Sequence, residues 1–288
     1  MPLSCLRQDG KAQRVGLKRE PGDLSCTVIK VSISEGERRN LMKIRHSYLL
    51  YMFTCLVFET TFKPLMGGGP PLVTDDTGTP GHNKWEINLA YTTKNTLRER
   101  ATGFILDANY GLGERTQINL VIPHTSIDHD VEGKNSGLGD IQFATKHRFI
   151  DETNWFTSIS ATPTVFMPTG CEHTTLDFFL PLEFERHIKS LYIGSQIGYF
   201  IHQEKATNNE LFYGFFGEYP IYKKVDVVGE IFGFVTEHTA ANPPLFNAGF
   251  RYRFSKLFSV MGSAGRSFSS RSDGEPHFLG YIGIRLNF

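Results

Sequence analysis

Charged side chains alternate with apolar ones through much of this sequence, and they are the residues best suited to chemistry. The set comprises Asp107, Lys146, Arg148, Glu183, Glu185, Glu218, Asp226, Glu230, Arg251, Arg253 and Arg285. Both signs occur in similar number, so these side chains can form ion pairs with one another. Alternatively, they can line an open bore and select among ions. Which of the two applies depends on the elements that position them.

A second set of residues is aromatic and falls in the middle of the chain: Phe166, Phe179, Phe200, Phe212, Phe216, Phe232 and Phe234. Small-molecule sites are mostly apolar and contain few polar groups, so these rings could receive a hydrophobic ligand. The alternative is that the rings pack on one another or on loops folded over them. The sequence leaves both interpretations open.

Catalytic motifs are missing from the sequence. It contains no HExxH, CxxC, P-loop or GxSxG pattern. A membrane-embedded lipid hydrolase would need a nucleophile within hydrogen-bond reach of a histidine, and no serine accompanies His147 in the pattern. We therefore expect no enzyme, no catalytic residue, no metal and no cofactor.

Strands must position these residues, because a period of two dominates from Lys84 to the C-terminus. In WEINLAY, for example, Trp85, Ile87, Leu89 and Tyr91 share one face. About twelve such segments follow one another, each near the roughly 9 to 11 residues that a tilted membrane strand needs. We therefore predict an all-β fold, a transmembrane antiparallel up-and-down β-barrel of about 12 strands. The apolar face of each strand is assigned to lipid, and the charged and Phe sets to the lumen.

The chain ends on an aromatic residue, whereas free ends are normally polar and loose. Phe288, Leu286 and Ile284 lie on one face of the last segment, as expected for a barrel strand whose outer face is apolar and whose ends lie in aromatic girdles. We interpret these three residues as a C-terminal assembly signal for the barrel-assembly machinery.

The connections between segments alternate in length. Short links near residues 111–116, 151–154, 188–190, 222–224 and 255–256 alternate with longer ones near 93–100, 125–138, 168–175, 203–209, 238–243 and 268–276. Short periplasmic turns and longer outer loops are typical of bacterial barrels. Pro163 and Pro181 fall inside two segments, where each removes a ladder hydrogen bond, so we predict paired bulges or a local bend there.

The front of the chain differs from the rest. Residues 1–41 are polar and aperiodic, and we interpret them as an over-extended N-terminus that is not part of the fold. Residues 42–67 combine a basic start with a short apolar run, as in a signal peptide. Residues 68–83 are rich in turn residues and are expected to form a periplasmic leader; the barrel is expected over residues 84–288. Of the four cysteines, only Cys171 lies in the expected barrel, so no disulfide follows.

The composition excludes some classes of function. The 288 residues carry a formal net charge of +0, which argues against a nucleic-acid partner, since such proteins normally carry a basic patch. The mean hydropathy of -0.23 resembles that of a soluble protein, as expected when lipid-facing and lumen-facing residues alternate.

Several stretches resemble a known family. GGPPLVTDDTGTPG followed by WEINLAY, then GLGDIQFATKHRF, and the PTG of VFMPTG are similar to the bacterial outer-membrane barrels described as "putative MetA-pathway of phenol degradation". The resemblance runs from about Gly68 to the C-terminus. It implies a signal-bearing, transporter-like protein of the Gram-negative outer membrane that takes up aromatic or other hydrophobic compounds. It offers no catalytic residues.

We therefore expect an outer-membrane channel or transporter-like barrel that passes hydrophobic or aromatic small molecules. Its expected partners are outer-membrane lipid, the assembly machinery and such a solute. The alternatives are a structural or surface-binding barrel with a plugged lumen and, least favoured, the lipid hydrolase.

Overall fold

The computed structural model describes residues 69–129, 133–170, 175–204, 207–237, 242–269 and 275–288. The segments interpreted as an over-extended N-terminus and a signal peptide lie outside these ranges, as does Cys171. Within the described ranges the secondary structure consists of strands and turns. No helix in this part of the chain is long and apolar enough to cross a membrane.

The described ranges contain fourteen strands. Their bounds are β1 Trp85–Asn95, β2 Glu99–Gly111, β3 Thr116–His129, β4 Gly133–Leu138, β5 Ile141–Ile150, β6 Ser158–Ala161, β7 Thr164–Met167, β8 Asp177–Ile188, β9 Leu191–Ile201, β10 Glu210–Tyr222, β11 Val225–Thr236, β12 Leu245–Arg253, β13 Phe258–Ser267 and β14 Phe278–Asn287.

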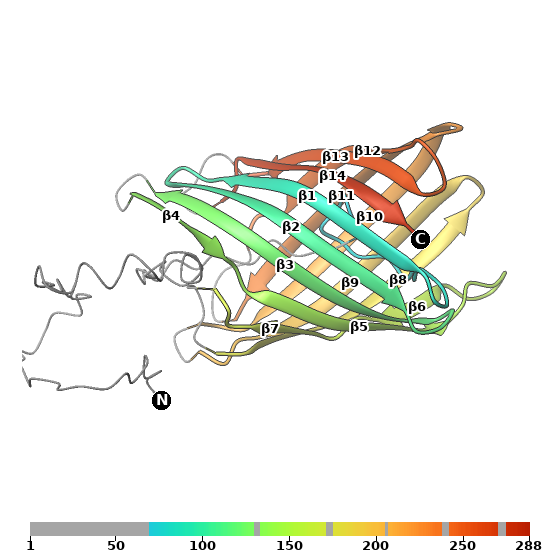
Figure 1. The fold of residues 1–288 in the computed structure, drawn as a ribbon, viewed down its shortest axis with the longest axis horizontal. Coiled ribbons are helices and arrows are strands. Elements are labelled where there is room, and N and C mark those ends of the chain that lie inside the picture. The colour runs from blue at the N-terminus through green and yellow to red at the C-terminus, as the bar shows by residue number, and fades with distance from the viewer. Residues whose placement is uncertain (1–68, 130–132, 171–174, 205–206, 238–241, 270–274) are drawn as a thin grey trace, which may run out of the picture. The chain divides into compact units, whose positions relative to one another are not determined.

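These strands form one closed antiparallel barrel (Figure 1). Neighbours in sequence are neighbours in the sheet, β1 pairs with β14, and β3 pairs with β5. Because β4 only extends the hairpin with β3, and β6 and β7 are two halves of one wall strand, the wall has twelve strands. The prediction of an up-and-down barrel of about twelve strands is confirmed.

The closure of the barrel uses the last residue of the chain. The backbone N–H of Trp85 donates to the carbonyl of Phe288 at 3.1 Å, and the N–H of Phe288 donates to the carbonyl of Trp85 at 3.0 Å. The register continues through Leu286 opposite Ile87 and Ile284 opposite Leu89. The aromatic C-terminus is therefore part of the ladder that seals β14 to β1.

The outer face is apolar, as the period of two indicates. Leu89, Phe104, Phe215 and Ile282 are 43%, 65%, 61% and 60% exposed, whereas their sequence neighbours Asn88 and Phe216 are buried. Aromatic side chains are also exposed at the end where the chain terminates, among them Trp85, Phe149, Tyr222, Phe254 and Phe288. This is the pattern of a lipid-facing band with an aromatic girdle.

Two of the predicted long connections are wrong. The link expected at 93–100 is only the turn 96–98 between β1 and β2, and most of the one expected at 125–138 is strand. There, β3 and β4 form a hairpin from His124 paired with Leu138 to His129 paired with Gly133. This hairpin lies at the end of the barrel opposite the C-terminus (Figure 1). Its polar residues do not alternate with apolar ones, so sequence periodicity did not reveal it.

The two prolines behave differently. The wall strand is interrupted at Pro163, between β6 and β7, as predicted, but Pro181 lies within the unbroken β8 and pairs with Gly198. On its other edge, β8 pairs with β6 and then with β7. Leu182 lies opposite Ala161 of β6, and Phe179 lies opposite Thr164 of β7. Pro181 therefore lies beside the interruption, where the ladder is already broken. Register irregularities instead lie in β5, between Arg148 and Ile150, and in β10, between Pro220 and Tyr222.

The assignment of the outer face to lipid can be tested by placing an arginine at two depths in the membrane. Phe215→Arg, near the middle of β10, is expected to lower the free energy of unfolding by about 2–4 kcal/mol, because a cation is placed on the lipid face. Tyr222→Arg, at the end of the same strand, is expected to cost only about 0–1 kcal/mol. Urea unfolding in lipid vesicles measures both. Equal costs would contradict the assigned lipid face.

Candidate functional site

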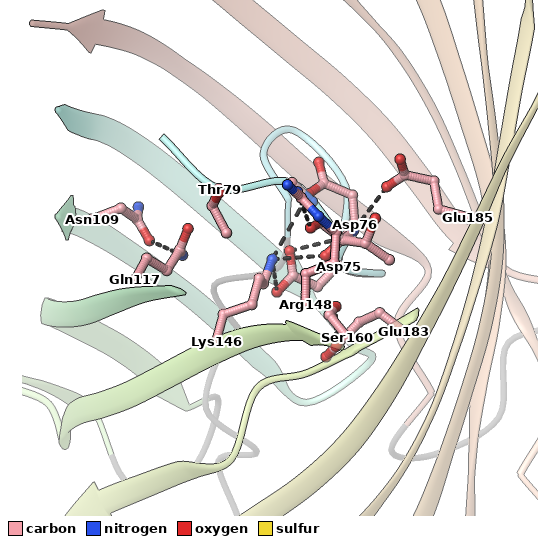
Figure 2. A network of polar contacts seen from close by, with 12 residues as sticks. Asp75, Asp76, Thr79, Asn109, Gln117, Lys146, Arg148, Ser160, Glu183 and Glu185 are labelled. Atoms are coloured by element: carbon pink, nitrogen blue, oxygen red, sulfur yellow. Dashed lines mark hydrogen bonds and ion pairs between the residues drawn. The ribbon is translucent and has the colours of Figure 1, made fainter. Parts of the chain in front are cut away.

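The segment before β1, here called the leader (residues 69–83), enters the barrel. Leu72, Thr74 and Thr77 are 8%, 1% and 1% exposed, and their contacts are to side chains on the inner face of the wall. Figure 2 shows the leader inside the barrel, with Asp75 and Asp76 among side chains from the strands. The structure thus places much of the segment expected as a periplasmic leader within the lumen.

Carboxylates of the wall bind the leader through its backbone N–H groups. The two oxygens of Glu230 accept hydrogen bonds from the N–H of Val73 and of Thr74, both at 2.8 Å. Glu185 accepts one from the N–H of Thr77 at 2.8 Å. Because charge-assisted hydrogen bonds are among the stronger ones, these contacts hold a segment that consists of turns and bends and belongs to no strand.

Basic and hydroxyl side chains bind the carbonyl groups of the same segment. Arg251 donates to the carbonyl of Pro70 at 3.1 Å, and Ser263 donates to that of Pro71 at 2.7 Å. Lys146 donates to the carbonyl of Asp76 at 2.7 Å, and Arg148 donates to that of Thr77 at 3.1 Å. The wall therefore satisfies both donors and acceptors of the leader's main chain.

Lys146 also forms the main ion pair of the leader. Its Nζ lies 2.9 Å from Asp75 and 3.7 Å from Asp76 (Figure 2). Burial raises the pKa of Asp75, although Lys146 opposes the shift. Burial also acts to raise the pKa of Asp76, but Lys146, Arg285 and Arg251 outweigh it, so that the pKa of Asp76 is lowered. Asp76 is therefore the more firmly ionised of the two carboxyl groups.

All the charged residues predicted in the lumen lie on the inner side of the wall, but only some form ion pairs with one another. Arg251 binds Glu218 at 2.9 Å and Arg253 binds Asp226. Mutual ion pairing therefore accounts for only part of this set. Lys146, Arg148, Glu185 and Glu230 bind the leader, Arg285 binds Glu86, and Glu183 and Asp107 bind neutral side chains.

At the turn between β5 and β6, Arg148 extends the leader contacts to the rim. Its Nε donates to Asp151 at 2.8 Å, and Arg115 also contacts this carboxylate. The hydrogen bond from Arg148 is the main reason that the pKa of the exposed Asp151 carboxyl is lowered. Arg148 thus links the leader carbonyl of Thr77 to the turn.

The predicted aromatic set lies inside the barrel, where the rings pack on one another. Phe166, Phe179, Phe200, Phe212 and Phe232 form a buried cluster with Leu245, and Val73 of the leader and Phe234 pack against it. The rings of Phe179 and Phe200 stack with centroids 4.1 Å apart. Phe216 lies in a second cluster with Leu72 and Val228. The geometry favours the packed alternative over an open vestibule.

A glycine makes room for one of these rings. An added Cβ at Gly198 on β9 would lie 2.4 Å from the ring of Phe179, so only glycine allows Phe179 to lie across the neighbouring strand.

A cavity of about 220 Å³, here called the passage, remains beside the leader. The passage extends from Glu86, near the start of β1, to Phe166 and Phe179. These two residues lie near the end of β7 and the start of β8, toward the other end of the barrel. Most of its lining is polar: Asp75, Asp76, Asp107, Asn109, Gln117, Asn119, Gln142, Lys146, Thr162, Thr164, Gln196 and Arg285. This open part of the bore is therefore narrow and mostly polar.

Sequence reasoning missed the carboxamides of the lumen. Asn88, Asn109, Gln117, Gln142 and Gln196 are at most 7% exposed. They lie on the same strand faces as the charged set, and that parity was the signal that could have identified them. Neutral polar side chains of this kind can bind solutes or the leader without introducing charge.

His147, on the outer face, has the hydroxyl of Thr116 as its hydrogen-bond partner, at 2.8 Å. Among the described residues, no group of three or more His, Cys, Asp or Glu lies close enough to hold a metal ion.

The fold and the lumen together define a membrane-type β-barrel whose bore is narrowed by its own N-terminal leader. The chain belongs to the family described as "Putative MetA-pathway of phenol degradation", whose model matches residues 67–281. This confirms the resemblance inferred from the leader and from the segment around β5.

Two solved structures are similar in fold. An outer membrane channel from Pseudomonas putida F1 matches with a TM-score of 0.60 and 13% identity, covering 74% of this chain and 98% of the other. The NanC porin matches with a TM-score of 0.51 and 9% identity, covering 69% and 98%. A comparison with curated proteins finds no match.

The position of the leader depends on a glycine of the wall. A Cβ added at Gly214 on β10 would lie 2.3 Å from Oγ1 of Thr74, so Gly214→Val is expected to displace the leader. Hydrogen exchange of the peptide covering residues 69–80 should then become faster. Gly217→Val is the matched control, since a Cβ there meets its nearest atom at 3.8 Å. Unchanged exchange in Gly214→Val would show that Thr74 does not rest on β10.

Proposed function

We propose that this protein is an outer-membrane channel whose leader restricts the bore to the passage described above. The observation that carries the proposal is the mostly polar lining of this cavity beside a leader that the wall binds by its backbone. A lumen meant only for structural support would be expected to bury its polar groups in mutual contacts rather than around open space.

The chemistry of the passage favours small solutes that combine a polar group with a ring. Carboxamides such as Asn109 and Gln117 offer donors and acceptors, while Phe166 and Phe179 offer aromatic surface at one end. The family description names phenol degradation, and phenols have this combination. Solutes of this class are therefore the proposed cargo, in place of purely apolar molecules received by an open aromatic vestibule.

Localisation in the outer membrane and partnership with the assembly machinery belong to the same proposal. They are supported by the lipid-facing band and girdle and by the fold shared with an outer membrane channel and a porin. In this proposal the face formed by Ile284, Leu286 and Phe288 serves as the assembly signal, and residues 42–67 serve as the signal peptide.

Single-channel recording of the refolded protein, from Gly67 onward, tests the channel. We expect small, steady conductance steps that phenol reduces when it occupies the passage. A second protein that starts at Pro80 lacks most of the leader, and its conductance should be several-fold larger. A folded barrel that stays silent in both forms would contradict the proposal.

The alternative of a plugged structural barrel makes a different prediction for the same pair of proteins. If the leader seals the bore, the longer protein is silent and only the protein starting at Pro80 conducts. The open space beside the leader is the specific observation that favours the channel over this alternative.

The proposed C-terminal assembly signal can be tested by measuring how much folded protein reaches the outer membrane. Deletion of Phe288 removes both hydrogen bonds to Trp85, and it is expected to reduce the amount of folded protein in the outer membrane severalfold. The fraction that migrates in the heat-modifiable, folded form on gels measures this. Phe258→Ala, which removes an outward ring at the same end of the barrel, is the control. Equal yields of the two variants would argue against a signal at Phe288.

A further inference from the structure

One carboxylate of the passage differs from the others in its partners. Asp107 on β2 is 5% exposed and accepts hydrogen bonds from the side-chain amides of Asn88 at 2.9 Å, Asn109 at 2.9 Å and Asn119 at 2.5 Å. Among the residues that the structure describes, no cation lies within 4.0 Å of it. Three neutral donors hold this carboxylate in place without cancelling its charge.

The other charges on the passage are paired. Lys146 binds Asp75 and Asp76, and Arg285 binds Glu86 at 3.1 Å. The lining thus contains four carboxyl groups, including Asp107, against two cations. Even when Asp75 takes up a proton, as its raised pKa allows, the carboxylates still outnumber the cations.

We propose that Asp107 makes the passage selective for cations and is its specificity-determining residue. The inference rests on the proposed channel function, because selectivity requires that ions enter the cavity. Charged side chains in a narrow, low-dielectric bore act on permeating ions much more strongly than in water. A carboxylate without a cation in direct contact attracts cations and repels anions, whereas the directly paired groups largely cancel one another's fields.

The position of Asp107 strengthens its effect on a permeating solute. It lines the passage and also a second, smaller cavity of about 60 Å³ on the other side of Pro70 and Val73. Both open spaces beside the leader therefore have this carboxylate in their walls.

The test is the reversal potential of the protein from Gly67 onward, measured in a planar bilayer under a potassium chloride gradient. The solution is kept mildly alkaline, above the ordinary titration range of carboxyl groups. We expect a potassium permeability several-fold larger than that of chloride in the wild type. Asp107→Asn, which keeps the shape and can still hydrogen bond, should bring the ratio close to one.

Two further variants separate the charge of Asp107 from other effects. Asp107→Glu keeps the charge and should remain cation-selective. Glu183→Gln also removes one buried lumen carboxylate, but Glu183 does not line the passage, so most of the selectivity should survive. Near-ultraviolet circular dichroism and heat-modifiable migration confirm that each variant is folded.

The outcomes distinguish the two proposals. A conducting wild type without cation preference, or one whose preference survives in a folded Asp107→Asn, overturns the role of Asp107 and leaves the channel intact. A loss of selectivity in Glu183→Gln equal to that in Asp107→Asn also overturns it, since the effect would then follow total lumen charge. A folded wild type that never conducts overturns both proposals.

Discussion

The hydrogen bonds between wall side chains and the backbone of the leader determine what this barrel can do. Without them, a twelve-stranded wall would enclose a bore lined by carboxylates, amides and basic groups. With them, Glu230 and Glu185 bind the N–H groups of the leader, while Lys146, Arg148 and Arg251 bind its carbonyls. The polar residues of the wall thus hold the leader inside the lumen, and the space that remains beside the leader is the passage.

The interior is divided by the chemistry of its lining. Toward the end of the barrel opposite the C-terminus, the rings of Phe179, Phe200 and Phe212 form a compact apolar cluster against Val73 of the leader. Toward the end where the chain terminates, the leader contacts charged groups instead. One segment therefore covers aromatic surface with its apolar residues and satisfies buried charges with its backbone, which reduces the desolvation cost of those charges.

The sequence predicted the wall well and the lumen only in part. Strict alternation in segments such as WEINLAY requires one apolar and one polar face, so strand number, lipid face and the inward parity of Asp107 or Glu230 could be inferred. The insertion of the leader could not, since GGGPPLVTDDTGTPG has no periodicity and its contacts use main-chain atoms that every residue possesses. The β3–β4 hairpin was missed because Lys134, Asn135 and Ser136 are polar on both faces. The packing of the Phe cluster depends on Gly198, whose role appears only when β8 and β9 are side by side.

Recognition through the main chain has a consequence for how this protein can be altered. Pro70 and Pro71 supply carbonyl acceptors to Arg251 and Ser263 and have no N–H that would need an acceptor of its own. Val73 and Thr74 supply the N–H groups for Glu230. What the wall requires of the leader is thus largely a pattern of donors and acceptors, together with the ion pair of Asp75 and Asp76 to Lys146 and the packing of Leu72 and Val73. Leader side chains that face the passage outside these contacts could therefore be exchanged to change its width and polarity while the segment stays anchored, so the leader is an adjustable insert in a fixed barrel.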